Sequence, residues 1–155
     1  MIQPSLAVAL LLGTGGYAAW SDVKYRRLPN VLAIVVAGLG LLYAAIETSL
    51  SAAASGMLHG LIALLVGLAL YSRGMVGGGD IKYYSATAIW FPLDQGFRLL
   101  AMVSFAGLVL LAGWLIWRRQ TGNPISFKAS TDSDKLPFGV AIATGAVLTA
   151  IGHLP

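Results

Sequence analysis

The chain has 155 residues, of which 57% are hydrophobic and only 10% are charged, and it contains no cysteine. This composition excludes a soluble globular protein and indicates a single membrane-embedded domain over residues 1–155. The missing cysteines exclude disulfides, thiol catalysis and Cys-type zinc sites, and the two histidines lack the spacing of a zinc-protease helix. We therefore expect no metal and no cofactor.

Apolar segments in chain order predict an all-α, polytopic protein with six transmembrane helices. The first runs from about Leu6 to Trp20 and has no Lys or Arg before it, so we expect a retained helix, not a cleavable signal peptide. The second runs from about Leu28 to Ile46, with Pro29 in its first turn. A soft connection rich in Ser, Ala and Gly follows at about 47–56. The remaining helices are expected at about 57–72, 81–92, 99–117 and 136–153.

A glycine-rich run, Arg73-Gly74-Met75-Val76-Gly77-Gly78-Gly79-Asp80-Ile81-Lys82, precedes the fourth helix. Glycine in a helix interior costs roughly 1 kcal/mol, so we expect the chain to open here. The fourth helix itself has about a dozen residues, fewer than the roughly 20 that span a bilayer. Asp80 is therefore predicted at the membrane edge, where an ionisable group is a candidate for function.

The basic residues predict the orientation of the chain. Alternating six spans across a bilayer places nine of the ten Lys and Arg residues on one side and only Arg98 on the other. Cytoplasmic loops carry the Lys/Arg excess, so the loops at about 21–28, 73–82 and 118–136 are predicted to be cytoplasmic and both termini to lie outside. Topology and inner-leaflet lipid then explain the basic charge, and no nucleic-acid partner is expected.

Two of the six acids, Asp22 and Asp80, lie at the predicted cytoplasmic boundary, each at a helix junction. Two carboxylates within hydrogen-bonding reach do not both ionise cheaply, so one keeps a proton near neutral pH. Such a pair supplies a general base to activate water and a general acid for the leaving group, which is aspartic-protease chemistry. The other acids lie in connections and are expected to be solvated: Glu47, Asp94, Asp132 and Asp134.

Other interpretations stay open for these residues. The glycines alone are also compatible with close helix packing, Asp80 with a helix cap, and Asp22 with a polar residue leaving the membrane. A proton- or cation-coupled membrane transport subunit would use the same acid pair. Against it, both acids lie at one membrane edge and no internal repeat is visible. A purely structural membrane subunit is the remaining alternative.

Three stretches resemble motifs of type IV prepilin peptidases, which are GxGD membrane aspartyl proteases. Asp22 with Arg27-Leu28-Pro29-Asn30 resembles their first motif, and Gly77-Gly78-Gly79-Asp80-Ile81-Lys82 resembles the GxGD signature. Leu136-Pro137-Phe138-Gly139 resembles the start of their closing helix, although Val140 stands where the longer enzymes usually have Pro. The three stretches occur in family order and spread over nearly the whole chain.

The resemblance implies that Asp22 and Asp80 are the catalytic aspartates. It implies supporting or substrate-binding roles for Gly77, Gly78, Gly79, Lys82, Arg27, Pro29, Asn30, Pro137, Phe138 and Gly139. Full-length members carry a cytoplasmic domain with paired cysteines after the first helix, and here only a short loop stands there. The chain thus resembles the short form found with Flp-type tight-adherence pili, and N-methyltransferase activity is not expected.

The function implied by the resemblance is that of a multi-pass aspartic endopeptidase of the bacterial inner membrane. Such an enzyme cuts the basic leader from prepilins and pseudopilins after a glycine, with its active site on the cytoplasmic side. The expected partners are the prepilin substrate, the lipid bilayer and the pilus assembly machinery.

Overall fold

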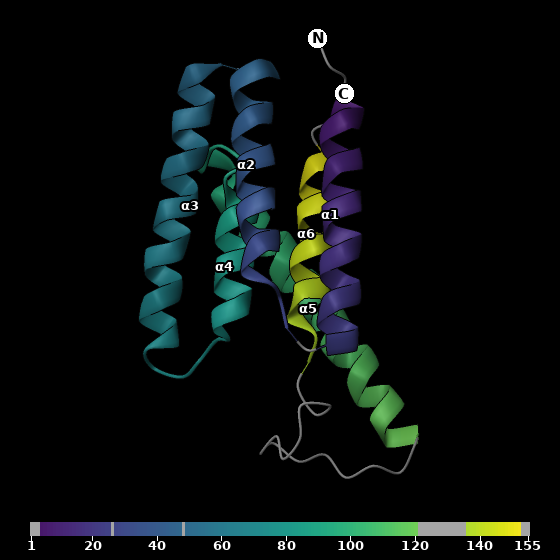
Figure 1. Cartoon of the computed structure of the whole chain (residues 1–155). Helices are drawn as coiled ribbons and strands as arrows, with labels where there is room; N and C mark the ends of the chain where they lie inside the picture. The colour runs from purple at the N-terminus through teal and green to yellow at the C-terminus, as the bar shows by residue number, and fades with distance from the viewer. Residues whose placement is uncertain (1–3, 26, 48, 121–135, 153–155) are drawn as a thin grey trace.

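The computed structural model of the chain describes residues 4–25, 27–47, 49–120 and 136–152 (Figure 1). This part of the chain forms six α-helices and one short 3-10 helix, and it contains no strand. In chain order they are α1 (Pro4–Tyr25), α2 (Asn30–Glu47), α3 (Leu50–Tyr71), α4 (Gly78–Ala88), η1 (Leu93–Gln95), α5 (Gly96–Gln120) and α6 (Phe138–Ile151). The all-α prediction is confirmed.

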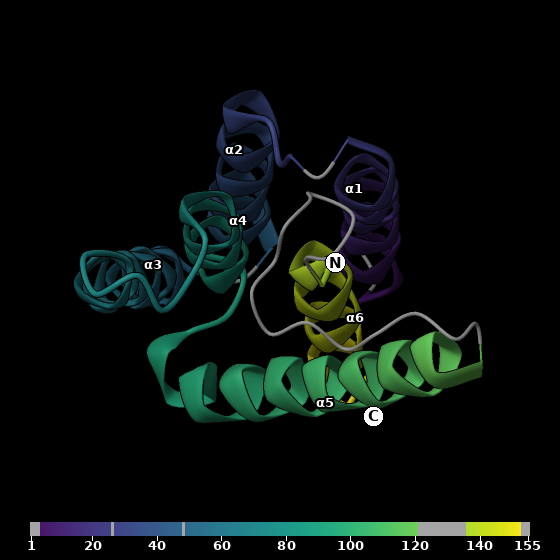
Figure 2. The same cartoon turned by 90° about the horizontal axis from the view of Figure 1, so that it is seen from below.

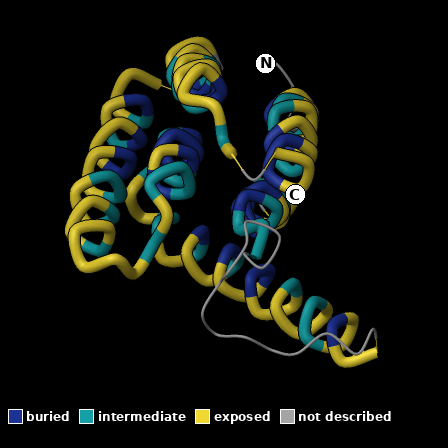
Figure 3. Tube along the Cα trace, turned by 60° about the horizontal axis from the view of Figure 1, so that its bottom comes forward, coloured by how far each residue is buried: buried dark blue, intermediate teal, exposed yellow. Residues whose placement is uncertain are grey.

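Within the described part of the chain, three helical stretches are long and apolar enough to cross a membrane: Leu6–Tyr25, Leu50–Tyr71 and Leu93–Gln120. The apolar helices Asn30–Ile46 and Phe138–Ile151 are shorter. Helix α4 has only 11 residues, or about 16 Å of helix, which is roughly half the thickness of a hydrocarbon core. The fourth helix is therefore short, as predicted. The outward faces of the helices are exposed (Figure 3), and many of the exposed residues are large and apolar, which is typical of a membrane protein.

Three predicted boundaries are wrong. Helix α1 runs to Tyr25, beyond the expected end at about Trp20. The expected soft connection at 47–56 is mostly helical, because the Ser49 side chain accepts the Ala52 N–H at 3.1 Å and starts α3 there. The glycine run opens only over residues 72–77, and Gly78 and Gly79 form the first turn of α4. These glycines lie against Tyr71 and Leu28, so tertiary packing overrides their low helix propensity.

The helices pack as two groups. Helices α2, α3 and α4 contact one another, and α6 lies between α1 and α5. The groups meet mainly where α4 packs on α6. Seen from below (Figure 2), α3 and α5 lie on outer sides, and α5 crosses the other helices, which are seen nearly end-on. This arrangement brings α4 and α6, from different groups, to the middle of the molecule.

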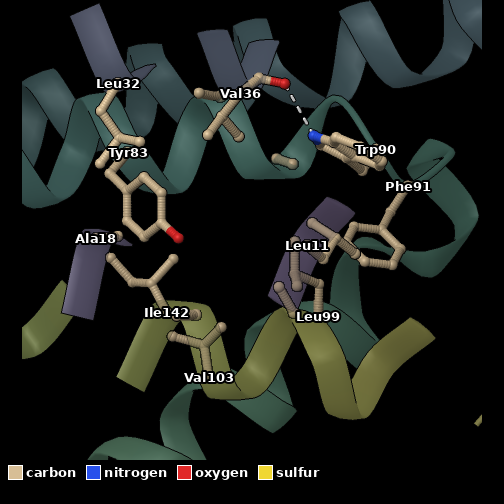
Figure 4. Close-up of a cluster of buried hydrophobic side chains, with 14 of the residues drawn as sticks. Leu11, Ala18, Leu32, Val36, Tyr83, Trp90, Phe91, Leu99, Val103 and Ile142 are labelled. Atoms are coloured by element: carbon tan, nitrogen blue, oxygen red, sulfur yellow. Dashed lines mark hydrogen bonds between the residues drawn. The ribbon is translucent and has the colours of Figure 1, made fainter. Parts of the chain in front are cut away.

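A buried apolar cluster joins the two groups (Figure 4). Val36 and Tyr83 come from the first group, and Leu11, Leu99 and Ile142 come from the second. The indole N–H of Trp90 donates to the Val36 carbonyl oxygen at 2.9 Å, so this large buried side chain also has its polar atom satisfied. The cluster holds α4 against α6 and thereby sets the relative position of the residues at their ends.

Side chains of α3 satisfy the backbone that connects α4 to α5. His59 Nδ1 lies 2.9 Å from the Phe91 carbonyl oxygen, and since a carbonyl only accepts, Nδ1 carries the hydrogen. The Ser55 hydroxyl accepts the Leu93 N–H at 2.9 Å. Non-helical backbone needs such partners where water is scarce. The buried histidine thus has a structural explanation, and two backbone groups of the connection after Ala88 have side-chain partners.

Helices α1, α3 and α5 end, and helices α2, α4 and α6 begin, at the same end of the molecule, at the bottom of Figure 1. We call this the loop end. The described parts of the predicted cytoplasmic loops lie here, and most of 118–136 lies outside the described residues. The candidate active site lies at the same end.

Candidate active site

Three segments that are far apart in the sequence converge at the loop end. Asp22 at the end of α1 accepts the Gly139 N–H of α6 at 2.7 Å. Leu28, in the α1–α2 connection, lies against Gly79 of α4. Next to it, Lys82 Nζ donates to Asn30 Oδ1 at 3.0 Å. The three stretches that resemble prepilin-peptidase motifs are therefore in contact.

Asp22 is buried, with 7% of its surface exposed, and it faces the start of α6. The Gly139 N–H belongs to the first helical turn, where backbone N–H groups have no partner inside the helix. The positive end of the helix dipole and this short hydrogen bond stabilise a negatively charged carboxylate. A Cβ at position 139 would lie 2.9 Å from Asp22 Oδ2, so only glycine fits here without displacing the acid.

Asp80 is only partly buried and lies in the first turn of α4, outside the three helical stretches that qualify as membrane spans. Its carboxylate turns back toward Gly77, where a Cβ would lie 2.8 Å from Oδ2. Burial, and secondly the charge of Asp22, raise the pKa of Asp80 from 3.8 to about 6. The two acids therefore interact electrostatically, and Asp80 is the one that holds a proton more readily than an ordinary aspartate.

Both acids line one cavity of about 670 Å³ at the loop end. We call it the polar cavity, because Arg27, Asn30 and Lys82 line it together with Asp22 and Asp80. Residues 74–77 and Gly79 supply much of the remaining wall. Within the described residues, no group of three or more His, Cys, Asp or Glu side chains is placed to hold a metal ion. The arrangement offers two carboxyl groups, two cations and a stretch of accessible backbone.

Some predicted supporting residues lie outside this cavity. Pro29 and Pro137 immediately precede α2 and α6, and their carbonyls accept the Leu32 and Val140 N–H groups at 3.0 and 3.2 Å. Gly78 faces the Tyr71 ring. The roles of these three that follow from the contacts are structural. Phe138 packs near Gly107 and lines a separate apolar space, described below.

Several residues at the cavity belong to the motif stretches quoted above or lie near them but were not predicted as site residues. Leu28, Met75, Val76 and Leu136 line it, and no local pattern distinguishes them from packing residues. Gly74 also lines it and has φ +71°, a left-handed conformation that favours glycine. Its position just after α3 is a usual signal for such a residue. The Ser21 hydroxyl donates to the Arg27 carbonyl at 2.8 Å and ties the end of α1 to the cavity wall.

Comparison with known proteins gives one decisive match. A model of the type IV leader peptidase family matches residues 9–112, which is more than half of the chain. The chain belongs to the type IV leader peptidase family. Among curated proteins and solved structures, none matches the chain.

Membership of the leader peptidase family confirms the resemblance that the motifs suggested. It makes the chain a peptidase at the level of the family, with prepilins as the class of substrate, and the apolar helices agree with a membrane protein. The matched residues include both Asp22 and Asp80 but end before α6. The contact between Asp22 and Gly139 is thus a structural link between the matched region and a helix outside it.

Proposed function

We propose that this leader peptidase family member is a membrane aspartic endopeptidase that removes the basic leader from Flp-type prepilins and pseudopilins, cutting after a glycine. The observation that carries the proposal is the meeting of Asp22 and Asp80 at one polar cavity, although 57 residues separate them in the chain. Family membership supports the substrate class. N-methyltransferase activity is not part of the proposal.

In the proposed mechanism the two acids share one proton. Asp22, beside the Gly139 N–H, is the charged base, and Asp80, whose pKa is raised to about 6, holds the proton. Asp22 removes a proton from water as the water oxygen attacks the carbonyl carbon of the scissile amide. Asp80 then gives its proton to the amide nitrogen as the C–N bond breaks. The products are a new carboxyl group on the leader and a new amino group on the pilin.

The glycine-rich wall of the polar cavity suits a peptide substrate. Without side chains, Gly77 and Gly79 leave backbone accessible to an extended strand, which would present its amide to the acid pair. The leader is basic and so are Arg27 and Lys82, so these cations do not attract it. Lys82 instead bonds to Asn30 and holds the start of α4 against the start of α2.

The proposed orientation places the loop end in the cytoplasm, with both termini outside. Nine of the ten Lys and Arg residues follow the predicted loops on that side, which supports it through the positive-inside rule. Of the six proposed crossings, the fourth covers about residues 81–92, from α4 into the connection after it, since α4 alone is too short. The bilayer is the inner membrane of a bacterium, where the pilus assembly machinery takes up the processed pilin.

The experiment that tests the function incubates membranes containing the protein with a prepilin and measures the pilin N-terminus by mass spectrometry. Wild type and Asp94→Asn, an acid in η1 away from the cavity, are expected to remove the leader. Asp22→Asn and Asp80→Asn are expected to insert normally and leave it attached. A transport subunit would leave the leader intact even with wild type. Cleavage by either cavity variant would exclude the two-acid mechanism.

A further inference from the structure

A second, apolar space lies beside the polar cavity. It is a groove of about 500 Å³ with walls from α3 and α5, and α4 and α6 contribute its floor. Ile62 and Val66 line one wall, and Phe97 and Leu100 line the other. All four side chains are at least 40% exposed, and no extensive packing joins α3 to α5 within the described residues. We call this space the apolar groove.

The apolar groove and the polar cavity adjoin each other, because Asp80 and Val76 line both. From this junction the groove follows α3 from Leu70 back to His59. Those twelve residues correspond to about 18 Å along a helix, or roughly three turns. Asp80 therefore stands at the boundary between a polar space that opens at the loop end and an apolar space that runs along the membrane-embedded helices.

We propose that the apolar groove binds the hydrophobic helix of the prepilin substrate, the segment that begins just after the scissile bond. This inference rests on the proposed function and locates its substrate. A prepilin changes from polar leader to apolar helix at the bond to be cut, and the protein changes from polar cavity to apolar groove at Asp80. Docking the helix in the groove brings that bond to the acids and puts the leader in the polar cavity.

A prepilin bound in this way accounts for both the apolar groove and the polar cavity, whereas the alternative occupants account for the apolar groove alone. A lipid acyl chain or a second copy of this protein would cover the exposed apolar walls. Neither would place a peptide bond beside Asp80 or use the glycine-rich wall of the polar cavity. Binding through the helix also provides affinity that the basic leader does not obtain from the cations of the cavity. Helix-in-groove recognition of this kind depends on apolar contacts spaced three and four residues apart.

Site-specific disulfide crosslinking tests the groove directly, because the native chain contains no cysteine. The test uses Val66→Cys in the groove and Leu65→Cys as a control one residue away on the same helix. Both native side chains are similarly exposed, at 55% and 58%, but only Val66 lines the groove. Each is combined with Asp80→Asn to keep the substrate intact, and a single cysteine is stepped through the first three turns of the prepilin helix.

The expected result is crosslinking through Val66→Cys that peaks every three or four prepilin positions, the period of one helix face. Leu65→Cys should give several-fold less product. The proposed binding of the prepilin helix in the groove would be wrong if both positions crosslinked equally. It would also be wrong if Val66→Cys gave no product while wild type still removed the leader. Ser104→Cys, on the opposite wall, repeats the measurement should Val66→Cys fail to insert. Loss of the leader in the Asp80→Asn background would instead contradict the catalytic proposal, so the two failures are distinguishable.

Discussion

The end of α1 around Asp22 and the start of α4 around Asp80 hold the same functional group in opposite settings. Asp22 is buried and bonded to backbone of α6, a helix more than a hundred residues later in the chain. Asp80 is only partly buried, and its carboxylate folds against a glycine three residues earlier. Distant packing orients the first acid and local backbone orients the second, which suits a charged base and a proton-carrying acid.

The two acids also belong to different packing groups. Asp22 lies on α1, with α5 and α6, and Asp80 lies on α4, with α2 and α3. The groups are joined mainly by the contact between α4 and α6, so that contact controls how far apart the carboxyl groups lie. Changes at α6 should therefore act on the pair through Asp22, and changes in the glycine run should act through Asp80.

The largest effect is expected from removing either carboxylate. Asp22→Asn and Asp80→Asn keep the shape of the side chain but lose the base or the acid, and general acid–base catalysis contributes roughly 10²- to 10⁴-fold. We expect prepilin cleavage to fall by about 10³-fold in each variant, with normal amounts of protein in the membrane. Because the residues act as a pair, the double variant should be little worse than either single one. Additive losses would show that the acids work independently.

Much of the fold, and the convergence of the two acids at one cavity, were predictable from the sequence. Long apolar stretches predict helices by composition, and the GxGD pattern marks Asp80 because four glycines crowd one short run. What sequence reasoning did not provide were contacts between segments distant in the chain. Gly139 bonds to Asp22 across 117 positions, and no local pattern encodes such a pairing. The start of α3 was missed because a stretch rich in Ala and Ser is also typical of a linker. The hydrogen bond from the Ala52 N–H to the Ser49 side chain identifies Ser49 as the N-cap of the helix.

The second prediction acts on the Asp22 side of the comparison. A Cβ in Gly139→Ala would lie 2.9 Å from Asp22 Oδ2 and 3.2 Å from its Cβ, so the carboxylate must move. A displacement of about 1 Å at a reacting group costs up to roughly 10²-fold in rate, and we expect kcat to fall by that order. Alanine is the better helix former, so helix propensity does not account for a loss.

The control for Gly139→Ala is Gly16→Ala, on the same helix as Asp22 but with open space around the added Cβ. Its activity should stay within about twofold of wild type, as for surface substitutions away from special features. Steady-state cleavage of a prepilin checks both variants. Equal activity of the two would mean that the start of α6 does not position Asp22.

The third prediction concerns pH. Because the pKa of Asp80 is raised to about 6, the group loses its proton above that pH, and kcat/KM should fall by about tenfold per pH unit on that side. The fold also binds this proton more tightly than the unfolded chain does. The stabilising contribution is therefore present below pH 3.8 and is lost as the pH rises through 6. Prepilin cleavage rates between pH 5 and 8 measure the first effect, and a flat profile would contradict the assignment of Asp80 as the acid.

The smallest effect is expected on the Asp80 side, where the crowding is with a side chain that is able to rotate. In Gly77→Ala the new Cβ would lie 2.8 Å from Asp80 Oδ2, while the backbone angles, φ −74° and ψ 139°, suit alanine. Forcing the carboxylate off its rotamer costs about 0.5–1.5 kcal/mol, which corresponds to a roughly 2- to 12-fold lower rate.

The matched control is Gly78→Ala, whose Cβ would meet the Tyr71 ring at an ordinary 3.4 Å, so its rate should stay near that of wild type. If Gly78→Ala lowered the cleavage rate more than Gly77→Ala, the glycine run would affect activity through the packing of α4 on α3 and not through the orientation of Asp80. The contrast between the two acids would then rest on their burial alone.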